Sequence, residues 1–406
     1  RGMSDKTVQL IAVSLGGGTF EIRSVQGCPV HMCGDCFELL LFARNDPGIF
    51  DTLRTLTPPH IRLCDGRNEA LTIYECKSAC PFSPAWITRL RHDVPIDDMA
   101  IVNPILPVVR GKETEMSFTN VKSANVYAET HGVDMGDLGL MYEQCISGLA
   151  GADIIEKMKQ IVRIIHNSIR IGLRGTQYQD RILQQQSHLI DTSEQEGKIK
   201  PSVVNRMIAY VSALMESKSA MEVVVAVPTA GSCGTVGGSL LALSEFIGAS
   251  ESEVVKAYFA AGLVGAYVAQ GPGFSAEEHG CQVECGAAAG MAAAGIVQLM
   301  GGTAGQALGA ASMAIQNMIG LICDPVADRV EVPCLGKNIS AAVNAYASAV
   351  MAVAGFDCVI PLDEVLETVS RVGNMMPRCH KCTGLGGLAT TETALKIKKK
   401  LKTYSK

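Results

Sequence analysis

The pattern of apolar and polar residues changes along the chain, from short β-prone runs to long stretches with helical spacing. Residues 8–13, 19–22 and 37–42 are the short runs, and three glycines at 16–18 separate the first two as a hairpin turn would. A Pro-Gly turn signal at 46–48 precedes a predicted helix. These features predict a small α+β module in the first part of the chain.

The second part of the chain reads as helical. Three stretches carry apolar residues at helical spacing: residues 155–171, 203–215 and 252–268. Ser250 with Glu253 forms a capping box for the third, and Thr303 with Gln306 forms another that opens a helix running to about Ile322.

Two more helices are rich in Ala and Gly. One covers residues 285–300, and the other runs through Ala354 with Asn338 or Ser340 as its cap. Small residues on so many faces permit close approach of helices and predict a nearly all-buried helical domain. We therefore expect an α+β fold class: an N-terminal α+β domain at 3–85, an irregular connector at 86–140 and a mostly α-helical catalytic domain at 141–406.

Composition narrows the range of functions. The 406 residues include 35 basic and 40 acidic side chains, a net charge of −5, so no overall field attracts nucleic acid. The apolar stretch at 341–356 is too short for a membrane span. Fifteen cysteines without a signal-peptide pattern indicate a reducing, cytoplasmic location. Arg1 and Gly2 are interpreted as a cloning remnant.

Three cysteines are candidate metal ligands: Cys281, Cys323 and Cys334. None belongs to a C-x-x-C knuckle, which argues against a zinc finger. Three thiolates that converge from separate loops suit an iron–sulfur cluster with one iron lacking a protein ligand. Three buried free cysteines are the alternative, and spacing alone does not decide between the two.

The motifs around these cysteines carry a resemblance. They are AVPTAGSCG at 226–234, GCQVE at 280–284, LMGG at 299–302, GLICDPV at 320–326 and VPCLGKN at 332–338. Together they closely resemble the catalytic α part of the iron–sulfur-dependent L-serine dehydratases, over about residues 141–392. The resemblance implies that Cys281, Cys323 and Cys334 hold a 4Fe–4S cluster. More faintly, residues 11–22 resemble the last hairpin of that family's β module, and an ACT-like fold follows.

The resemblance implies a lyase that converts L-serine, or a related β-substituted amino acid, to pyruvate and ammonia. An open iron would act on the leaving group as a Lewis acid. An L-cysteine desulfidase that releases sulfide is the close alternative, and a non-catalytic amino-acid-sensing relative is another. The expected partners are a small amino-acid substrate, a second copy in a homodimer and, in one interpretation, a second subunit.

Candidate substrate and catalytic residues follow from the same motifs. The hydroxyls of Thr229 and Ser232 are expected to bind the substrate carboxylate. Lys337 and Asn338 are further candidates for that contact, with a loop lysine and a helix cap as the alternatives. The family's β-module motif with a catalytic histidine is absent from the sequence. His279, two residues before Cys281, is the proposed base, and simple packing in the loop is the alternative.

Other cysteines raise two further questions. Cys28, Cys33 and Cys36 have a ferredoxin-like spacing and are followed by three more cysteines before residue 81. Reduced structural thiols are the favoured interpretation over a second metal site. Residues 379–389 resemble the family's Gly-rich tail, which is expected to enter the active site and to bring Cys379 or Cys382 toward the open iron when substrate is absent. A plain surface turn is the alternative, and it is favoured for Cys379 but not for Cys382.

Overall fold

The structure is a computed structural model, and it describes most of the chain. The described residues are 10–12, 20–23, 29–32, 37–44, 46–58, 62–67, 71–78, 82–102, 118–178 and 181–403. The chain divides into two compact units, Arg1–Ile11 with Gly18–Val109, and Ala12–Gly17 with Arg110–Lys406. We call them the N-terminal unit and the helical unit. The boundaries predicted near residues 85 and 140 stay predictions.

An antiparallel sheet organises the N-terminal unit. Its strand order is β5-β6-β4-β7. The strands are β4 (Phe37–Arg44), β5 (Arg62–Arg67), β6 (Leu71–Ser78) and β7 (Asp98–Val102). In the register, Leu41 of β4 faces both Tyr74 and Met99. Alternate residues point to opposite faces of a strand, and Leu39, Leu41 and Ala43 are all fully buried.

Two helices contribute to the core of this sheet. They are α1 (Pro47–Leu56) and α2 (Pro84–Asp93). Ile49 and Leu53 of α1 and Leu90 of α2 lie in one buried cluster with the strand residues. Asp46 caps α1, since its Oδ1 accepts from the Gly48 amide at 2.9 Å. The turn signal and the helix predicted after it are therefore confirmed.

Three short strands precede the sheet: β1 (Leu10–Ala12), β2 (Phe20–Arg23) and β3 (Pro29–Met32). β2 pairs antiparallel with β3 in a two-stranded sheet that does not contain β1. The predicted hairpin, which would pair the first run with the second, is therefore wrong. The residues that were expected to form its turn, 16–18, lie outside the described part of the chain. A pattern of β-prone runs predicts strands but not which strands pair.

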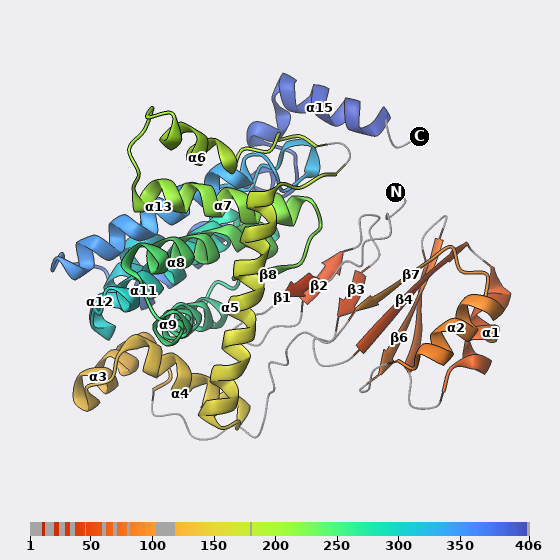
Figure 1. Ribbon diagram of the computed structural model, residues 1–406, viewed down its shortest axis with the longest axis horizontal. Helices are drawn as coiled ribbons and strands as arrows, with labels where there is room; N and C mark the ends of the chain where they lie inside the picture. The colour runs from red at the N-terminus through yellow and green to blue at the C-terminus, as the bar shows by residue number, and fades with distance from the viewer. Residues whose placement is uncertain are drawn as a thin grey trace. The chain divides into compact units, whose positions relative to one another are not determined.

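The helical unit makes the chain mostly helical (Figure 1). Its helices are α3 (Val121–His131), α4 (Met135–Ser147), α5 (Gly151–Arg174), α6 (His188–Gln195), α7 (Val203–Ser219), α8 (Cys233–Ile247), α9 (Glu251–Gln270), α10 (Ala276–His279), α11 (Cys285–Leu299), α12 (Ala304–Gln316), α13 (Cys334–Val353), α14 (Leu362–Met375) and α15 (Glu392–Thr403). Short elements between them are β8 (Val224–Ala226), η1 (Ala230–Ser232), η2 (Cys281–Val283), η3 (Val326–Asp328), η4 (Arg378–His380) and η5 (Gly387–Thr390).

Helix α11 is the centre of this unit and packs against α8, α9, α12 and α13. Its close approach to α9 depends on Gly295, where a Cβ would stand 3.0 Å from the Ala257 carbonyl oxygen. The contact of α5 with α7 is tighter still, because a Cβ at Gly172 would stand 1.9 Å from the Ala213 carbonyl oxygen. The close helix approach predicted from small residues is confirmed.

The sequence predicted the start of a helix correctly where a local capping box sets it, and less well where contacts with other parts of the fold set it. The capping boxes at Ser250 and Thr303 are both confirmed. Helix α12 ends at Gln316, earlier than expected, and Gly320 follows with a φ of 85°. Helix α13 begins at Cys334, so Asn338 lies inside the helix and is not its cap.

The stretch expected to be irregular, residues 86–140, is largely regular where it is described. It contains most of α2, all of β7 and α3, and the start of α4. Capping boxes at Asn120 and Asp134 open α3 and α4. In both boxes the cap is Asn or Asp, and the third helical residue is a short side chain, Ser123 or Asp137. This pattern is a weaker sequence signal than Ser or Thr followed by Glu or Gln.

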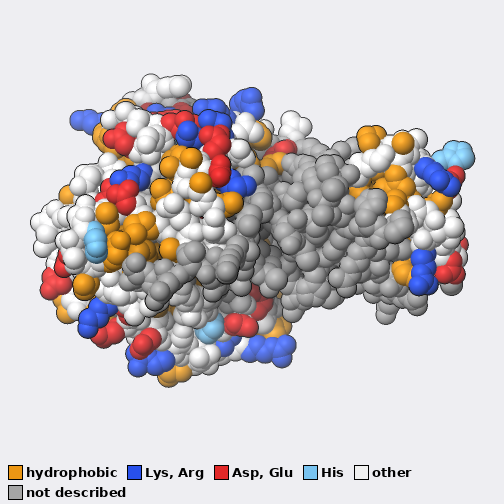
Figure 2. Space-filling view, turned by 90° about the horizontal axis from the view of Figure 1, so that it is seen from below, with side chains coloured by type: hydrophobic (Ala, Val, Ile, Leu, Met, Phe, Trp, Pro, Cys, Tyr) orange, Lys and Arg blue, Asp and Glu red, His pale blue; other side chains and the backbone are white. Residues whose placement is uncertain are grey.

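The surface of the helical unit mixes charges of both signs. On the face shown in Figure 2, acidic and basic side chains are interspersed with apolar ones. Among the described helices, none combines the length and the hydropathy that crossing a membrane requires.

Candidate metal centre and active site

Three segments that are far apart in sequence meet at the candidate site. The Gln282 amide donates to the Leu321 carbonyl at 3.1 Å. The Cys323 amide donates to the His380 carbonyl at 2.8 Å, and the Cys382 amide donates back to Cys323 at 3.2 Å. Backbone hydrogen bonds thus hold the η2 turn, the loop after α12 and the Gly-rich tail together. The entry of the tail into the active site stays a prediction.

Two of the three predicted cysteine ligands come together. The sulfurs of Cys281 and Cys323 and a carboxylate oxygen of Glu284 all lie within 4.8 Å of one another. Both cysteines are buried, at 2% and 3% exposed. Hydrogen bonding to the Cys281 and Cys382 thiols, together with burial, raises the pKa of Cys323. Closely spaced buried thiols are a soft donor set of the kind that iron–sulfur clusters use.

Cys334 lies close by but its sulfur is not in that group of donor atoms. It is the first residue of α13 and is buried. Burial raises the pKa of its thiol to about 12, and the neighbouring charge of Cys281 acts in the same direction. Its role as the third cluster ligand stays a prediction.

Glu284 is the residue of the site that sequence reasoning missed. Its Oε2 accepts from Cys281 Sγ at 3.8 Å, and its Oε1 accepts from Thr229 Oγ1 at 2.7 Å. Burial raises the pKa of the Glu284 carboxyl. The available signal was its position three residues after Cys281, which places both on one side of a helical turn.

The loop with Thr229 and Ser232 reaches the thiol site through Glu284. The two hydroxyl oxygens are 3.0 Å apart, and the Ser232 amide donates to Thr229 Oγ1 at 3.2 Å. A Cβ at Gly231 would stand 2.8 Å from Glu284 Oε1, so a larger residue there would displace the carboxylate. The loop is therefore connected to Cys281 through Glu284, and its contact with substrate stays a prediction.

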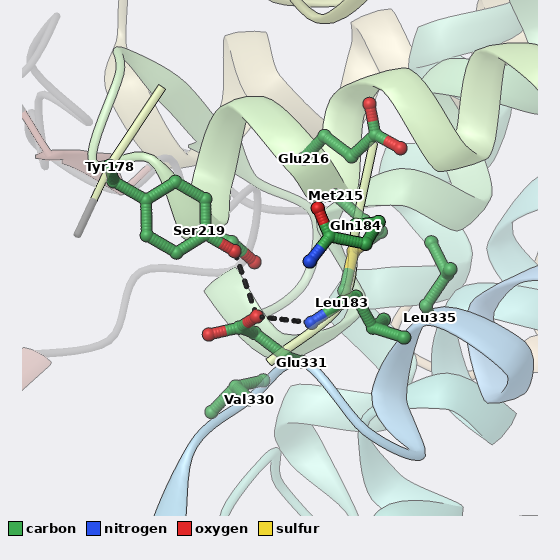
Figure 3. A pocket seen from close by; sticks show the side chains of 9 residues that line it. All are labelled: Tyr178, Leu183, Gln184, Met215, Glu216, Ser219, Val330, Glu331 and Leu335. Atoms are coloured by element: carbon green, nitrogen blue, oxygen red, sulfur yellow. Dashed lines mark hydrogen bonds between the residues drawn. The ribbon is translucent and has the colours of Figure 1, made fainter. Parts of the chain in front are cut away.

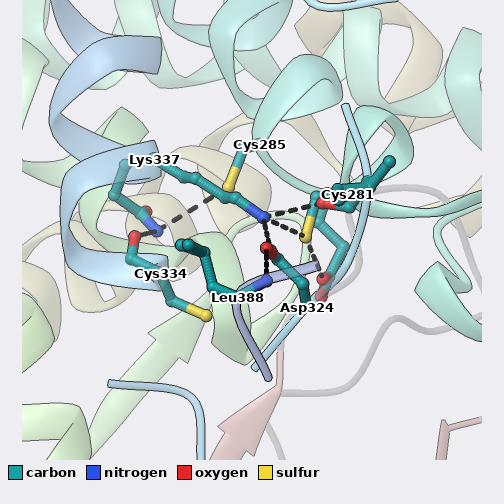
Figure 4. A network of polar contacts seen from close by, with 9 residues as sticks. Cys281, Cys285, Asp324, Cys334, Lys337 and Leu388 are labelled. Carbon is teal, nitrogen blue, oxygen red and sulfur yellow. Dashed lines mark hydrogen bonds and ion pairs between the residues drawn. The ribbon is translucent and has the colours of Figure 1, made fainter. Parts of the chain in front are cut away.

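Lys337 points into the same site (Figure 4). Its Nζ lies 2.6 Å from Asp324 Oδ1, 2.7 Å from the Ile322 carbonyl oxygen and 3.9 Å from Cys281 Sγ. Asp324 also accepts from the Leu388 amide at 2.9 Å. The predicted contact of Lys337 with a substrate carboxylate would require it to give up one of these three bonds.

Asn338 is fully buried beside the site, on the inner face of α13. Its Nδ2 donates to the carbonyls of Gly231 and Cys334 at 2.8 and 2.9 Å. Its Oδ1 accepts from the amide and the hydroxyl of Thr235 at 3.2 and 3.0 Å. The Asn338 amide thus connects the Thr229–Ser232 loop to the start of α13. Both Nδ2 hydrogens are used in these bonds, so the predicted contact of Asn338 with substrate would require one of them to break.

His279 ends α10 next to the η2 turn. Its ring packs against α14, where a Cβ at Gly373 would stand 2.3 Å from His279 Cδ2. Its Nδ1 is buried and finds no hydrogen-bond partner among the described residues. Buried polar atoms are usually paired, so this nitrogen calls for an explanation such as a proton-transfer role or a bound water. Its role as the base stays a prediction.

A small cavity lies beside the start of α13, where Val330, Glu331 and Leu335 are among the residues that line it (Figure 3). Two buried carboxylates hold the chain around it. Glu331 accepts from Tyr178 Oη at 2.8 Å and from the Leu183 amide at 3.2 Å, and Glu216 accepts from the Ser187 amide at 3.0 Å. Glu331 thus ties the segment before α6 to the turn that precedes Cys334, and Glu216 ties the same segment to α7.

The question of a second metal site is not answered by the described residues. Cys28, Cys33, Cys36 and Cys80 lie outside them, as does the side chain of Cys64. Cys76 is fully buried in the core of the N-terminal sheet. The interpretation of these cysteines as structural thiols stays a prediction.

Comparisons with known proteins place the whole site within one matched region. The family "Serine dehydratase alpha chain" matches residues 98–389. The chain is 34% identical over 285 residues to the probable L-serine dehydratase, alpha chain, of Bacillus subtilis (strain 168), covering 70% of this chain and 95% of that protein. It is 34% identical over 273 residues to the L-serine dehydratase, alpha chain, of Peptoniphilus asaccharolyticus (66% and 92%) and 31% identical over 259 residues to L-serine dehydratase TdcG of Escherichia coli (strain K12) (62% and 57%).

Proposed function

Because the chain belongs to the serine dehydratase alpha chain family, we propose that it dehydrates and deaminates L-serine to pyruvate and ammonia with a 4Fe–4S cluster. The observation that carries the proposal is the convergence of the buried Cys281 and Cys323 sulfurs. We assign the cluster to these two cysteines and to Cys334, which begins the neighbouring helix.

The residues present fit such a cluster. Thiolates are the usual protein ligands of iron–sulfur clusters, and the site is shielded from solvent. When bound, the cluster supplies a Lewis-acidic iron for the hydroxyl of the substrate. Everything else that the reaction needs has to come from side chains: a group to hold the carboxylate and a base to take the α-proton.

In this proposal the Thr229–Ser232 loop binds the substrate carboxylate. Its hydroxyls lie next to Glu284, which in turn contacts Cys281, so the loop and the cluster site are one connected arrangement. His279 takes the α-proton. A neutral imidazole nitrogen is a suitable acceptor, and Nδ1 is not engaged by any described residue.

We further propose a role in assembly or regulation for the N-terminal unit, whose sheet and helices support an ACT-like or β-module-like fold. Two of the relatives are named as alpha chains, which supports a second subunit. We also propose that the protein forms a homodimer and is located in the cytoplasm.

Product analysis after anaerobic reconstitution with iron and sulfide tests the proposed function. L-Serine and L-cysteine are supplied separately, and pyruvate, ammonia and sulfide are quantified, with the iron-free protein as control. Pyruvate with ammonia from L-serine supports dehydration. Sulfide from L-cysteine with no turnover of L-serine would show a desulfidase, and a stable cluster without turnover would show a binding protein.

A further inference from the structure

The ammonium group of Lys337 has all its donors in use at the thiol site. Lysine has three N–H donors, and Nζ contacts three acceptors: Asp324 Oδ1, the Ile322 carbonyl and Cys281 Sγ. The side chain is 13% exposed. Lys337 therefore presents a fixed positive charge to a sulfur that the proposed function assigns to the cluster.

Asp324 fixes that charge in place. Its side chain is 5% exposed, and each of its two carboxylate oxygens accepts one bond, Oδ1 from Lys337 and Oδ2 from the Leu388 amide. The tail can come this close because residue 387 is glycine, where a Cβ would stand 2.6 Å from Asp324 Oδ2. One buried ion pair thus connects the Cys281 turn, the Cys323 loop and the Gly-rich tail (Figure 4).

We propose that the Lys337–Asp324 pair sets the reduction potential of the cluster held by Cys281. This rests on the proposed function, since it requires the cluster. Hydrogen bonds to the sulfurs, nearby charge and solvent exposure set the potential of an iron–sulfur cluster. The reduced cluster carries one more electron, so a neighbouring positive charge stabilises it and a negative charge opposes it. Lys337 therefore raises the potential, and Asp324 lowers it.

The opposite signs make the test specific. We would reconstitute the full chain and its Lys337→Met, Lys337→Arg and Asp324→Asn variants, and titrate each with a reductant while following the reduced cluster by electron paramagnetic resonance. Lys337→Met should shift the midpoint to lower potential and Asp324→Asn to higher potential. Lys337→Arg keeps the charge and the donors, so it should stay near the parent value.

Iron content is measured in the same samples as the control for cluster loading. Shifts of Lys337→Met and Asp324→Asn in the same direction indicate a mere structural disturbance and overturn the proposal. Parent-like potentials in both variants at full iron content overturn it as well. If Lys337→Met does not retain a cluster, the other two variants decide, because an unshifted Asp324→Asn refutes the proposal. A parent chain that forms no cluster would refute the proposed function and this inference with it.

Discussion

Removing the Thr229 hydroxyl tests how the substrate loop is joined to the cluster site. Thr229→Val keeps the shape of the side chain but deletes the 2.7 Å hydrogen bond to Glu284 Oε1 and the acceptor for the Ser232 amide. Leaving a buried donor or acceptor without its partner costs about 1–3 kcal/mol. If that energy positions the loop for the transition state, kcat/KM for L-serine should fall about 10- to 100-fold, since about 1.4 kcal/mol corresponds to a factor of ten.

The assay is initial-rate pyruvate formation under anaerobic conditions at matched iron content. Thr303→Val is the matched control, because Thr303 also caps a helix with its hydroxyl, accepting from the Gln306 amide at 3.2 Å, but does not contact Glu284. It should cost about 1 kcal/mol of stability and leave kcat/KM unchanged. If Thr229→Val shows the kinetics of the control, the loop takes no part in catalysis and its hydrogen bond to Glu284 does not position it for the reaction.

Three further predictions concern the base, the helix packing and the pH dependence of stability. His279→Ala should retain iron but lose both pyruvate formation and exchange of the substrate α-hydrogen with deuterated solvent. The control variant His131→Ala, at an exposed histidine, should behave as the parent. Normal exchange in His279→Ala would show that another residue is the base. Gly172→Ala should lower the free energy of unfolding by about 1–3 kcal/mol, because its Cβ meets the Ala213 carbonyl. Gly336→Ala, whose Cβ would meet no atom of the described residues within 4 Å, should raise it by about 0.5–1 kcal/mol. Urea unfolding compares the two variants, and equal stabilities would contradict the tight α5–α7 contact. Burial raises the pKa of Glu143 to about 7 from an ordinary 4.5, so the unfolded chain loses this proton first and the free energy of unfolding falls as the pH rises from 4.5 to 7. Glu143→Gln should therefore be more stable than the parent at pH 8 but not at pH 4. An equal stability difference at both pH values would refute the raised pKa.

The sequence predicted the family and much of the local structure, because both depend on residues close together in the chain. The motifs around the three cysteines led to the serine dehydratases, and the match to that family over residues 98–389 confirms it. The capping boxes at Ser250 and Thr303 were confirmed as well. In both cases a short stretch of sequence contains all the atoms that make the feature.

What could not be predicted depends on contacts between distant segments. Asn338 looked like a helix cap or a substrate ligand, and only the fold shows its amide bonded to Thr235 and Gly231. Glu284 stood inside a quoted motif, but its role becomes visible only when Thr229 reaches it from 55 positions away. Lys337 was predicted to contact a substrate carboxylate, and only the fold shows its ion pair with Asp324.

The iron content of single cysteine variants after anaerobic reconstitution tests the assignment of the cluster most directly. Cys281→Ser, Cys323→Ser and Cys334→Ser are compared with the parent and with Cys358→Ser, a cysteine outside the candidate site, with circular dichroism to verify folding. The three site variants should lose most of their iron and the visible absorption of the cluster, while Cys358→Ser keeps both. Equal iron content in all four variants would contradict the assignment of the cluster to this site.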